Sequence, residues 1–384
     1  MSDNTQKPIY LDYNATTPHD PEVIAAMRPY LEEHFGNPSS SHWYGVQTKN
    51  AVENARRQVA SLLNCQPDEI VFTSGGTESN NYAIKGIAFA NQDKGNHIIT
   101  TQIEHPAVIE VCKFLEEHGF EVTYLLVDEF GLVSVFDVQK AITHRTILIT
   151  VMHANNEVGT IQPIEEISKL AKERGIIIHT DAAQSVGKIP TDVNLLGVDL
   201  LSIAGHKLYA PKGIGALYIR RGVQLAKFMH GAGHERGKRA GTENVLEIVG
   251  LGKACEIAKR DLEKSMQQMR ERRDGLHNGL KEKLKDIKLN GHPEKRLPNT
   301  LSLSFGGLDS NMLISEIKKY LAASAGAACH SGEVEISYVL RAMNVPIEWA
   351  KGTLRFSTGK MTTENEISNA INVISDAVIR LRSK

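Results

Sequence analysis

Apolar stretches that alternate with helix-like segments are the feature that most constrains how this chain folds. Four of them, HIITT, VTYLLV, TILITVM and GIIIHTD, follow one another before residue 182. Segments with helical spacing of apolar residues separate them, at about Ala107–His118, Val135–Ile142 and Ile164–Arg174. Continuously apolar strands joined by helices predict a mainly parallel sheet covered on both faces, so the predicted fold class is α/β.

Three more strands extend this pattern. EIVFT runs into SGGT, where a helix opens at Thr77, and LLSIAGHK is followed closely by GIGALYI. The connection between the last two is too short for a helical crossover, so we expect at least one antiparallel neighbour in the sheet.

The pattern changes after a long charged helix predicted from Glu247 to about Asp286, whose apolar seam is interrupted by Arg273. NTLSLSF and TLRFS are predicted strands, and a Thr363…Glu366 capping box opens the final helix. We therefore expect a large domain at residues 15–260 and a small α+β domain at residues 261–384, joined by residues 1–14.

Composition narrows the class of partners. Of the 384 residues, 41% are hydrophobic and 23% are charged, and the formal net charge is −1. Such a balance gives no global attraction to nucleic acid or to anionic membranes. The N-terminus has no apolar run behind a basic start, and no stretch is long enough to cross a bilayer, so we expect a cytoplasmic protein.

The four cysteines are widely spaced and form no C-x-x-C pair, which predicts neither a disulfide framework nor a zinc ribbon. Cys65 and Cys112 have apolar neighbours and Cys255 falls in a helical pattern, so we expect three buried, inert thiols. Cys329 differs, because it lies in AASAGAACHSG, a run of small residues predicted to form a loop.

Lys207 and Asp181 are candidates for chemistry. Lys207 follows Gly205 and His206 in an apolar turn, where desolvation disfavours the ammonium and leaves an amine able to form a Schiff base. Asp181 ends an apolar strand, where a carboxylate needs a cationic partner such as the pyridinium of pyridoxal phosphate. A surface lysine and a structural ion pair are the alternatives.

Other polar groups are also predicted at strand ends. The SGGT loop offers free N–H groups at a helix N-terminus together with the Thr77 hydroxyl, which suits a phosphate, although many such turns are simple helix caps. His105 and Asn156 each follow a strand, and each could instead be a structural polar group. In an open α/β sheet the strand ends are where ligands bind.

With these motifs together, the chain resembles the group I cysteine desulfurases and selenocysteine lyases of the class V aminotransferases. The resemblance runs from YLDYNATTP to the last helix through FTSGGTESNN, IEHPAV, MHANNEVGTIQP, HTDAAQSVGK, GHKLYAPKGIGALYIRR, HGAGHERGKRAGTEN and LRFSTGK. It implies the pyridoxal phosphate fold type I, with a mainly parallel seven-stranded sheet and a smaller C-terminal domain. It also implies a homodimer.

The resemblance assigns roles to the residues that meet the substrate. Lys207 would be the Schiff-base lysine, His105 would stack on the cofactor ring and move protons, and Cys329 would be the nucleophile. Arg355 and Asn14 would bind the substrate, with the Arg355 guanidinium clamping its carboxylate. L-cysteine would become L-alanine, and its sulfur would pass to Cys329 as a persulfide and then to an acceptor such as an iron–sulfur scaffold.

The resemblance also implies how pyridoxal 5'-phosphate would be held. Asp181 would pair with the pyridine nitrogen, Gln184 with the phenolic oxygen, and Asn156 would lie against the ring substituents. The phosphate contacts would come from Gly76, Thr77 and His206, with Thr242 reaching the cofactor of the neighbouring subunit.

Two departures from the family pattern bear on function. Ala204 stands where many relatives have a serine whose hydroxyl contacts the phosphate, so one hydrogen bond of roughly 1 kcal/mol is missing or replaced. The cysteine loop has GAACHS where housekeeping desulfurases often have GSACTS, and GAACHS also resembles the selenocysteine lyases. The alternatives are therefore a selenocysteine lyase, another fold type I aminotransferase or decarboxylase, and a Cys/His metal-binding module.

Overall fold

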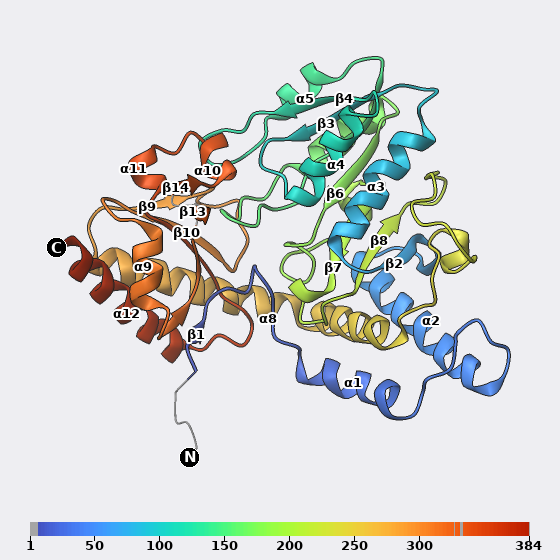
Figure 1. Ribbon diagram of the computed structural model, residues 1–384, viewed down its shortest axis with the longest axis horizontal. Helices are drawn as coiled ribbons and strands as arrows, with labels where there is room; N and C mark the ends of the chain where they lie inside the picture. The colour runs from blue at the N-terminus through green and yellow to red at the C-terminus, as the bar shows by residue number, and fades with distance from the viewer. Residues whose placement is uncertain (1–6, 326, 331–332, 384) are drawn as a thin grey trace.

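The computed structural model describes residues 7–325, 327–330 and 333–383, and for residues 327–330 and 333–335 it describes the backbone alone. A seven-stranded sheet forms the centre of the molecule (Figure 1). Its strand order is β2 (Ile70–Thr73), β8 (Gly215–Ile219), β7 (Leu200–Ala204), β6 (Ile177–Asp181), β5 (Thr146–Thr150), β3 (His97–Thr101) and β4 (Glu121–Leu125). The strands from β7 to β4 pair in parallel, whereas β8 pairs antiparallel with both β7 and β2. The predicted mainly parallel sheet with an antiparallel neighbour is confirmed.

Along β2 and β8, alternate side chains enter two separate cores, as the two-residue period of a strand predicts. On β2, for example, Phe72 belongs to one core and Val71 to the other. Helices α3 (Gly76–Ala90) and α4 (Pro106–Glu116) cover the Val71 face. The Phe72 face is covered by α2 (Trp43–Leu63), α6 (Ile164–Glu173), α7 (Val193–Leu196) and the first part of α8 (Val245–Lys283).

The C-terminal part folds around a separate four-stranded antiparallel sheet. This is the smaller α+β part that the predicted fold class includes. The strand order is β12 (Ser324–Ala325), β15 (Thr353–Ser357), β10 (Thr300–Phe305) and β9 (Ile287–Asn290). Helices α9 (Ser310–Ile317) and α12 (Glu364–Arg382) pack on it, and α12 begins with the predicted capping box. Strand β1 (Ile9–Tyr10) pairs in parallel with β11 (Leu321–Ala322), which brings the start of the chain to this part.

Helix α8 passes from one core to the other and ends three residues before the predicted limit. Leu251 belongs to the core of the large sheet, while Leu276 belongs to the core of the four-stranded sheet. Arg273, which interrupts the apolar seam, is buried. Its guanidinium donates a hydrogen bond of 2.7 Å to the Leu297 carbonyl and pairs with Asp274, and these contacts make its burial tolerable. The boundary predicted at residues 260/261 falls inside this helix, and the two-domain division stays a prediction.

One local expectation was wrong. Around Cys329 the backbone forms a hairpin of β13 (Ala327–His330) with β14 (Glu333–Ile336), because the alternating EVEI segment supplies a pairing strand.

The remaining elements are short connectors, with the exception of α1. They are α1 (Pro21–Glu32), α5 (Val135–Ala141), α10 (Tyr338–Ala342), α11 (Ile347–Ala350) and the 3-10 turns η1 (Pro67–Glu69), η2 (Gly205–Lys207) and η3 (Glu235–Gly237). Within the described ranges, every helix is too short or too polar to traverse a lipid bilayer.

Candidate active site

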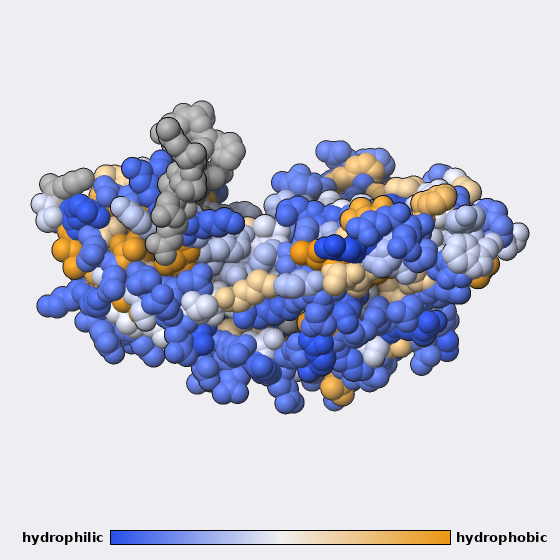
Figure 2. Space-filling view, turned by 90° about the horizontal axis from the view of Figure 1, so that it is seen from below, coloured by the Kyte–Doolittle hydropathy of each residue, from blue (hydrophilic) through white to orange (hydrophobic). Residues whose placement is uncertain are grey.

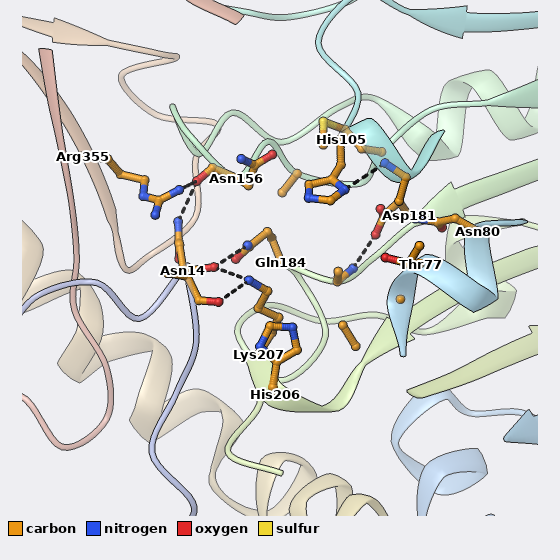
Figure 3. Close-up of a pocket in the computed structure, with 17 residues that line it drawn as sticks. Asn14, Thr77, Asn80, His105, Asn156, Asp181, Gln184, His206, Lys207 and Arg355 are labelled. Atoms are coloured by element: carbon orange, nitrogen blue, oxygen red, sulfur yellow. Dashed lines mark hydrogen bonds between the residues drawn. The ribbon is translucent and has the colours of Figure 1, made fainter. Parts of the chain in front are cut away.

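A cavity of about 330 Å³ opens at the carboxyl ends of the parallel strands (Figure 3). Ten of the twelve predicted site residues line it, because β3, β5, β6 and β7 all end at this edge of the sheet. They are Asn14, Gly76, Thr77, His105, Asn156, Asp181, Gln184, His206, Lys207 and Arg355. The other two are Thr242 and Cys329.

Lys207 lies in η2, directly after β7, and points into the cavity. Its Nζ donates to the backbone carbonyls of Asn14 and Ala15, at 2.6 Å each. Burial, and secondarily the charge of Arg355, lowers the pKa of Lys207 to about 8, while Asp12 and Asp181 oppose the shift. A substantial fraction of this amine is therefore neutral near physiological pH, as nucleophilic attack on a carbonyl requires.

Asp181, the last residue of β6, is fixed from two sides. The amide of Asn80 donates to its Oδ2 at 2.7 Å, and the backbone N–H of Ala183 donates to its Oδ1 at 2.9 Å. Sequence reasoning missed Asn80. The available signal was its place one helical turn after Gly76, which puts it on the buried side of α3.

The N-terminus of α3 provides a place for an anion. Gly75 caps the helix without a side-chain contact, so no side chain of the cap satisfies the N–H groups of the first turn. A Cβ on Gly76 would come within 3.2 Å of the Ala204 Cβ, so glycine keeps this space open. Across the cavity, burial and the charges of nearby lysines lower the pKa of His206 to about 4, which leaves this imidazole neutral.

His105 caps α4, and its Nδ1 accepts a hydrogen bond of 3.1 Å from the Ala107 N–H. Because Nδ1 accepts, the proton of the neutral ring is on Nε2. Burial lowers the pKa of His105, and the charge of Asp181 partly opposes this. The neutral ring can therefore stack on a flat ligand.

Arg355 and Asn156 close the opposite side of the cavity. The Arg355 guanidinium donates to Asp12 Oδ1 and to Ser324 Oγ, at 2.8 Å each, and to the Asn156 carbonyl at 3.1 Å. Two buried atoms here, Arg355 Nε and Asn156 Oδ1, have no hydrogen-bond partner among the described residues. Buried polar atoms in native proteins are nearly always paired, so both point to a polar ligand.

The structure does not place the two remaining predicted residues at the cavity. Thr242 is exposed and does not line the cavity. The backbone of Cys329 pairs with Val334 in the β13–β14 hairpin, and its side chain lies outside the described part of the chain.

The other three cysteines fit the expectation of inert thiols, with one correction. Cys112 and Cys255 are buried, but Cys65 is only partly buried. Burial raises the pKa of Cys65 and of Cys255 to about 12, so both are thiols at neutral pH. In the described ranges, no three His, Cys, Asp or Glu side chains are grouped so as to hold a metal ion.

The cavity residues fit pyridoxal phosphate. They include an amine with a lowered pKa, a fixed carboxylate, a helix N-terminus kept open by glycine, a neutral imidazole and unpaired polar atoms. These match the aldehyde, the pyridine nitrogen, the phosphate, the ring face and the polar substituents of that cofactor.

Comparison with known proteins agrees with this fit. The family model of the class V aminotransferases matches residues 9–369. A cysteine desulfurase IscS from Dictyoglomus turgidum is 49% identical over 98% of this chain and 96% of its own length. Another from Methanosarcina thermophila is 50% identical over 98% and 93%.

Solved structures resemble the fold as a whole. A NifS-like protein superposes with a TM-score of 0.92 at 38% identity, covering 97% of this chain and 100% of its own. The structure described as SspA in complex with cysteine gives 0.81 at 39% identity, covering 92% and 99%.

Proposed function

This chain belongs to the class V aminotransferase family, and on that premise we propose that it is a pyridoxal phosphate-dependent cysteine desulfurase. The observation that carries the proposal is that Lys207, Asp181 and Arg355 line one cavity, although they come from distant parts of the chain. An amine for the aldehyde, a carboxylate for the pyridine nitrogen and a guanidinium for the substrate carboxylate are the three charged groups that such a reaction needs.

Each cavity residue then has a defined task. Asp181, Gln184 and Asn156 would hold the ring, and the phosphate would lie at the N-terminus of α3, near Gly76, Thr77 and His206. When bound, pyridoxal phosphate stabilises negative charge at the Cα of the substrate. The neutral Lys207 amine would take the Cα proton and return a proton later, and His105 would stack on the ring and move protons nearby.

Arg355 and Asn14 would bind the substrate. Arg355 Nε has no partner among the described residues, and Asp12 and the Asn156 carbonyl hold the guanidinium, so an incoming carboxylate would meet a cation that is already oriented. A planar guanidinium can bind a carboxylate through two N–H groups at once, which orients the substrate as well as holding it.

Cys329 would receive the sulfur. Its thiolate attacks the sulfur of L-cysteine, the Cβ–S bond breaks and an S–S bond forms. The carbon skeleton gains a proton and leaves as L-alanine, and Cys329 keeps the sulfur as a persulfide. One cysteine and one thiol thus give one alanine and one persulfide, without an outside oxidant or reductant.

We also propose that two copies form a homodimer. Thr242 is exposed and does not line the cavity of its own chain, which fits a role at the cofactor of a partner subunit. Apolar side chains reach the surface in the half of the molecule that holds α1 and α2 (Figure 2). The α1–α2 patch consists of Leu31, Phe35, Trp43, Tyr44 and Val46, all 40–81% exposed. Patches of this kind mark interfaces.

We also propose that the enzyme is cytoplasmic and passes its sulfur to an acceptor protein, such as an iron–sulfur scaffold; the relatives named above are described as cysteine desulfurases. Selenocysteine lyase remains the second candidate function, because the GAACHS segment around Cys329 favours it. Another aminotransferase or decarboxylase would have no use for Cys329, and the described residues offer no support for a metal module.

The test is to incubate the purified protein, loaded with pyridoxal phosphate, with L-cysteine or L-selenocysteine and a thiol reductant. Alanine, sulfide and selenide are then measured. A cysteine desulfurase gives alanine and sulfide in equal amounts from cysteine. Turnover of selenocysteine alone would assign the lyase activity instead, and no alanine from either substrate would refute both.

A further inference from the structure

A second lysine, Lys188, lies buried beside the cavity. After β6 the chain makes a helical turn, in which the N–H groups of Val186 and Ile189 bond to the carbonyls of Ala182 and Ser185. Lys188 follows Gln184 by four residues in this turn, so the two side chains lie on one face. Lys188 is 4% exposed.

The Lys188 amine has two hydrogen-bond partners, and both belong to the proposed site. Its Nζ donates to Gln184 Oε1 at 2.8 Å and to Asn14 Oδ1 at 3.3 Å. The same Asn14 oxygen accepts from the Asn299 amide at 2.9 Å. Gln184 Nε2 in turn donates to the Asn14 carbonyl at 3.0 Å.

These contacts determine which way the Gln184 amide faces. The reverse orientation would put Oε1 3.0 Å from the Asn14 carbonyl, and two acceptors would then face each other. It would also remove the acceptor for the Lys188 amine. Gln184 must therefore direct its NH₂ group away from Lys188, and one of the two N–H bonds remains for a ligand in the cavity.

We propose that Lys188 is a positioning residue, which fixes Gln184 so that it offers the cofactor a hydrogen-bond donor and never an acceptor. This inference rests on the proposed function, in which Gln184 meets the phenolic oxygen of pyridoxal phosphate. A donor at that oxygen favours its ionised form, and so both tightens cofactor binding and changes the absorption of the bound cofactor.

The surroundings of Lys188 indicate that its amine is needed for hydrogen bonding, and that the side chain does more than fill space. The positive charges of Lys207 and Arg355 act on its amine, and both disfavour a further positive charge there. A cavity of about 20 Å³ beside it is lined by Asp20, Asp261 and Lys360, among others. Burial lowers the pKa of Lys188 well below its usual value. An apolar side chain such as methionine would fill the space without this desolvation.

The experiment compares four full-length proteins with the wild type, each prepared without cofactor: Lys188→Met, Gln184→Ala, the double variant, and Lys169→Met as the matched control on the exposed face of α6. Three quantities are measured: the dissociation constant for pyridoxal phosphate, the pH midpoint of the visible absorption of the bound cofactor, and the unfolding temperature of the cofactor-free protein.

We expect Lys188→Met and Gln184→Ala each to weaken binding roughly tenfold and to raise the pH midpoint by about one unit. The double variant should also lose only about tenfold, because the lysine acts through the glutamine. Lys169→Met should match the wild type. A hundredfold loss in the double variant, or a lower unfolding temperature in Lys188→Met with unchanged binding and midpoint, would overturn the proposal.

Gln184→Glu keeps the inference testable if Lys188→Met does not fold. Glutamate still accepts from Lys188, but it has no N–H to offer, so the pH midpoint should rise as in Gln184→Ala. An unchanged midpoint would refute the inference while leaving the function intact. A wild-type protein that shows no visible band with pyridoxal phosphate would instead refute the proposed function.

Discussion

Asn80 Nδ2 lies 2.7 Å from Asp181 Oδ2, so the first turns of α3 are joined to the end of β6 at the bottom of the cavity. Asn80 is 1% exposed, and its Oδ1 has no partner among the described residues. The contact orients the Asp181 carboxylate toward the place where the pyridine nitrogen would lie.

Replacing Asn80 by alanine should weaken pyridoxal phosphate binding roughly fivefold to tenfold, because Asp181 loses one hydrogen bond that orients it. Equilibrium titration of the cofactor-free protein measures this. Asn81→Ala is the matched control, since its amide donates to the Thr77 carbonyl in an exposed hydrogen bond. Equal affinities for Asn80→Ala and the wild type would show that Ala183 alone is enough to orient Asp181.

Recombination of the cofactor-free protein with pyridoxal phosphate should speed up as the pH is raised through about 8. Burial lowers the pKa of Lys207 to about 8, and only the neutral amine attacks the aldehyde. Stopped-flow absorbance gives the profile, and Lys207→Ala should show no covalent attachment after reduction. A midpoint near 10.5, the ordinary value, would contradict the burial seen here.

The same pKa has a consequence for stability. Between about pH 8 and 10.5 the folded lysine has released its proton while the unfolded lysine keeps it, so the unfolded state binds more protons. The free energy of unfolding of the cofactor-free protein should therefore rise with pH in this window, relative to Lys207→Met. Urea titrations at several pH values would reveal the difference.

Cys329→Ser should keep the visible absorption of the bound cofactor, yet lower alanine and sulfide formation from cysteine by about a hundredfold or more, because the nucleophile is lost. Cys65→Ser is the control, and it should retain activity because burial keeps that thiol protonated. A selenocysteine lyase would keep much of its selenocysteine turnover after Cys329→Ser. Full cysteine turnover would exclude the persulfide mechanism.

Ala204→Ser should tighten pyridoxal phosphate binding about fivefold, since one added hydrogen bond contributes roughly 1 kcal/mol. Ala204 lines the cavity beside Gly76, so a hydroxyl there would face the proposed phosphate position. Titration of the cofactor-free variant tests this. Weaker binding would mean that the hydroxyl crowds Gly76 and that the space is already filled by the phosphate.

If the α1–α2 patch forms the proposed dimer interface, Trp43→Asp combined with Phe35→Asp should give monomers at micromolar concentration, because a charge in this patch resists burial. Sedimentation velocity measures the mass. Leu195→Asp, at a residue that is 71% exposed on α7, is the control and should stay dimeric. A dimer that survives the double substitution would place the interface elsewhere.

The large sheet could be predicted because its strands are apolar on both faces, as Ile98 and Ile99 illustrate by entering different cores. The location of the site could then be predicted from the sheet, since parallel strands bring their carboxyl ends to one edge. Asn80 and Lys188 could not be found in this way. Their roles depend on which side of a helical turn faces the cavity, and on Asn14 arriving from a distant segment.

The hairpin around Cys329 could not be predicted for a different reason. Small residues with little preference of their own predicted a loop, but pairing with Glu333–Ile336 converts Ala327–His330 into a strand. Local composition did not reveal this partner, because the strand formed through pairing and not through the propensity of its own residues.

Segments that are far apart in the sequence close the cavity together. The Asn156 carbonyl accepts hydrogen bonds from Asn14 and from Arg355, and the Asn14 N–H bonds to Ser357, 343 residues later. On the ribosome, the large sheet can form long before Arg355 has been translated. We therefore expect the nascent chain to complete its cofactor cavity only after Arg355 has emerged from the ribosome, which sets the earliest moment at which the site can hold a cofactor and a substrate together.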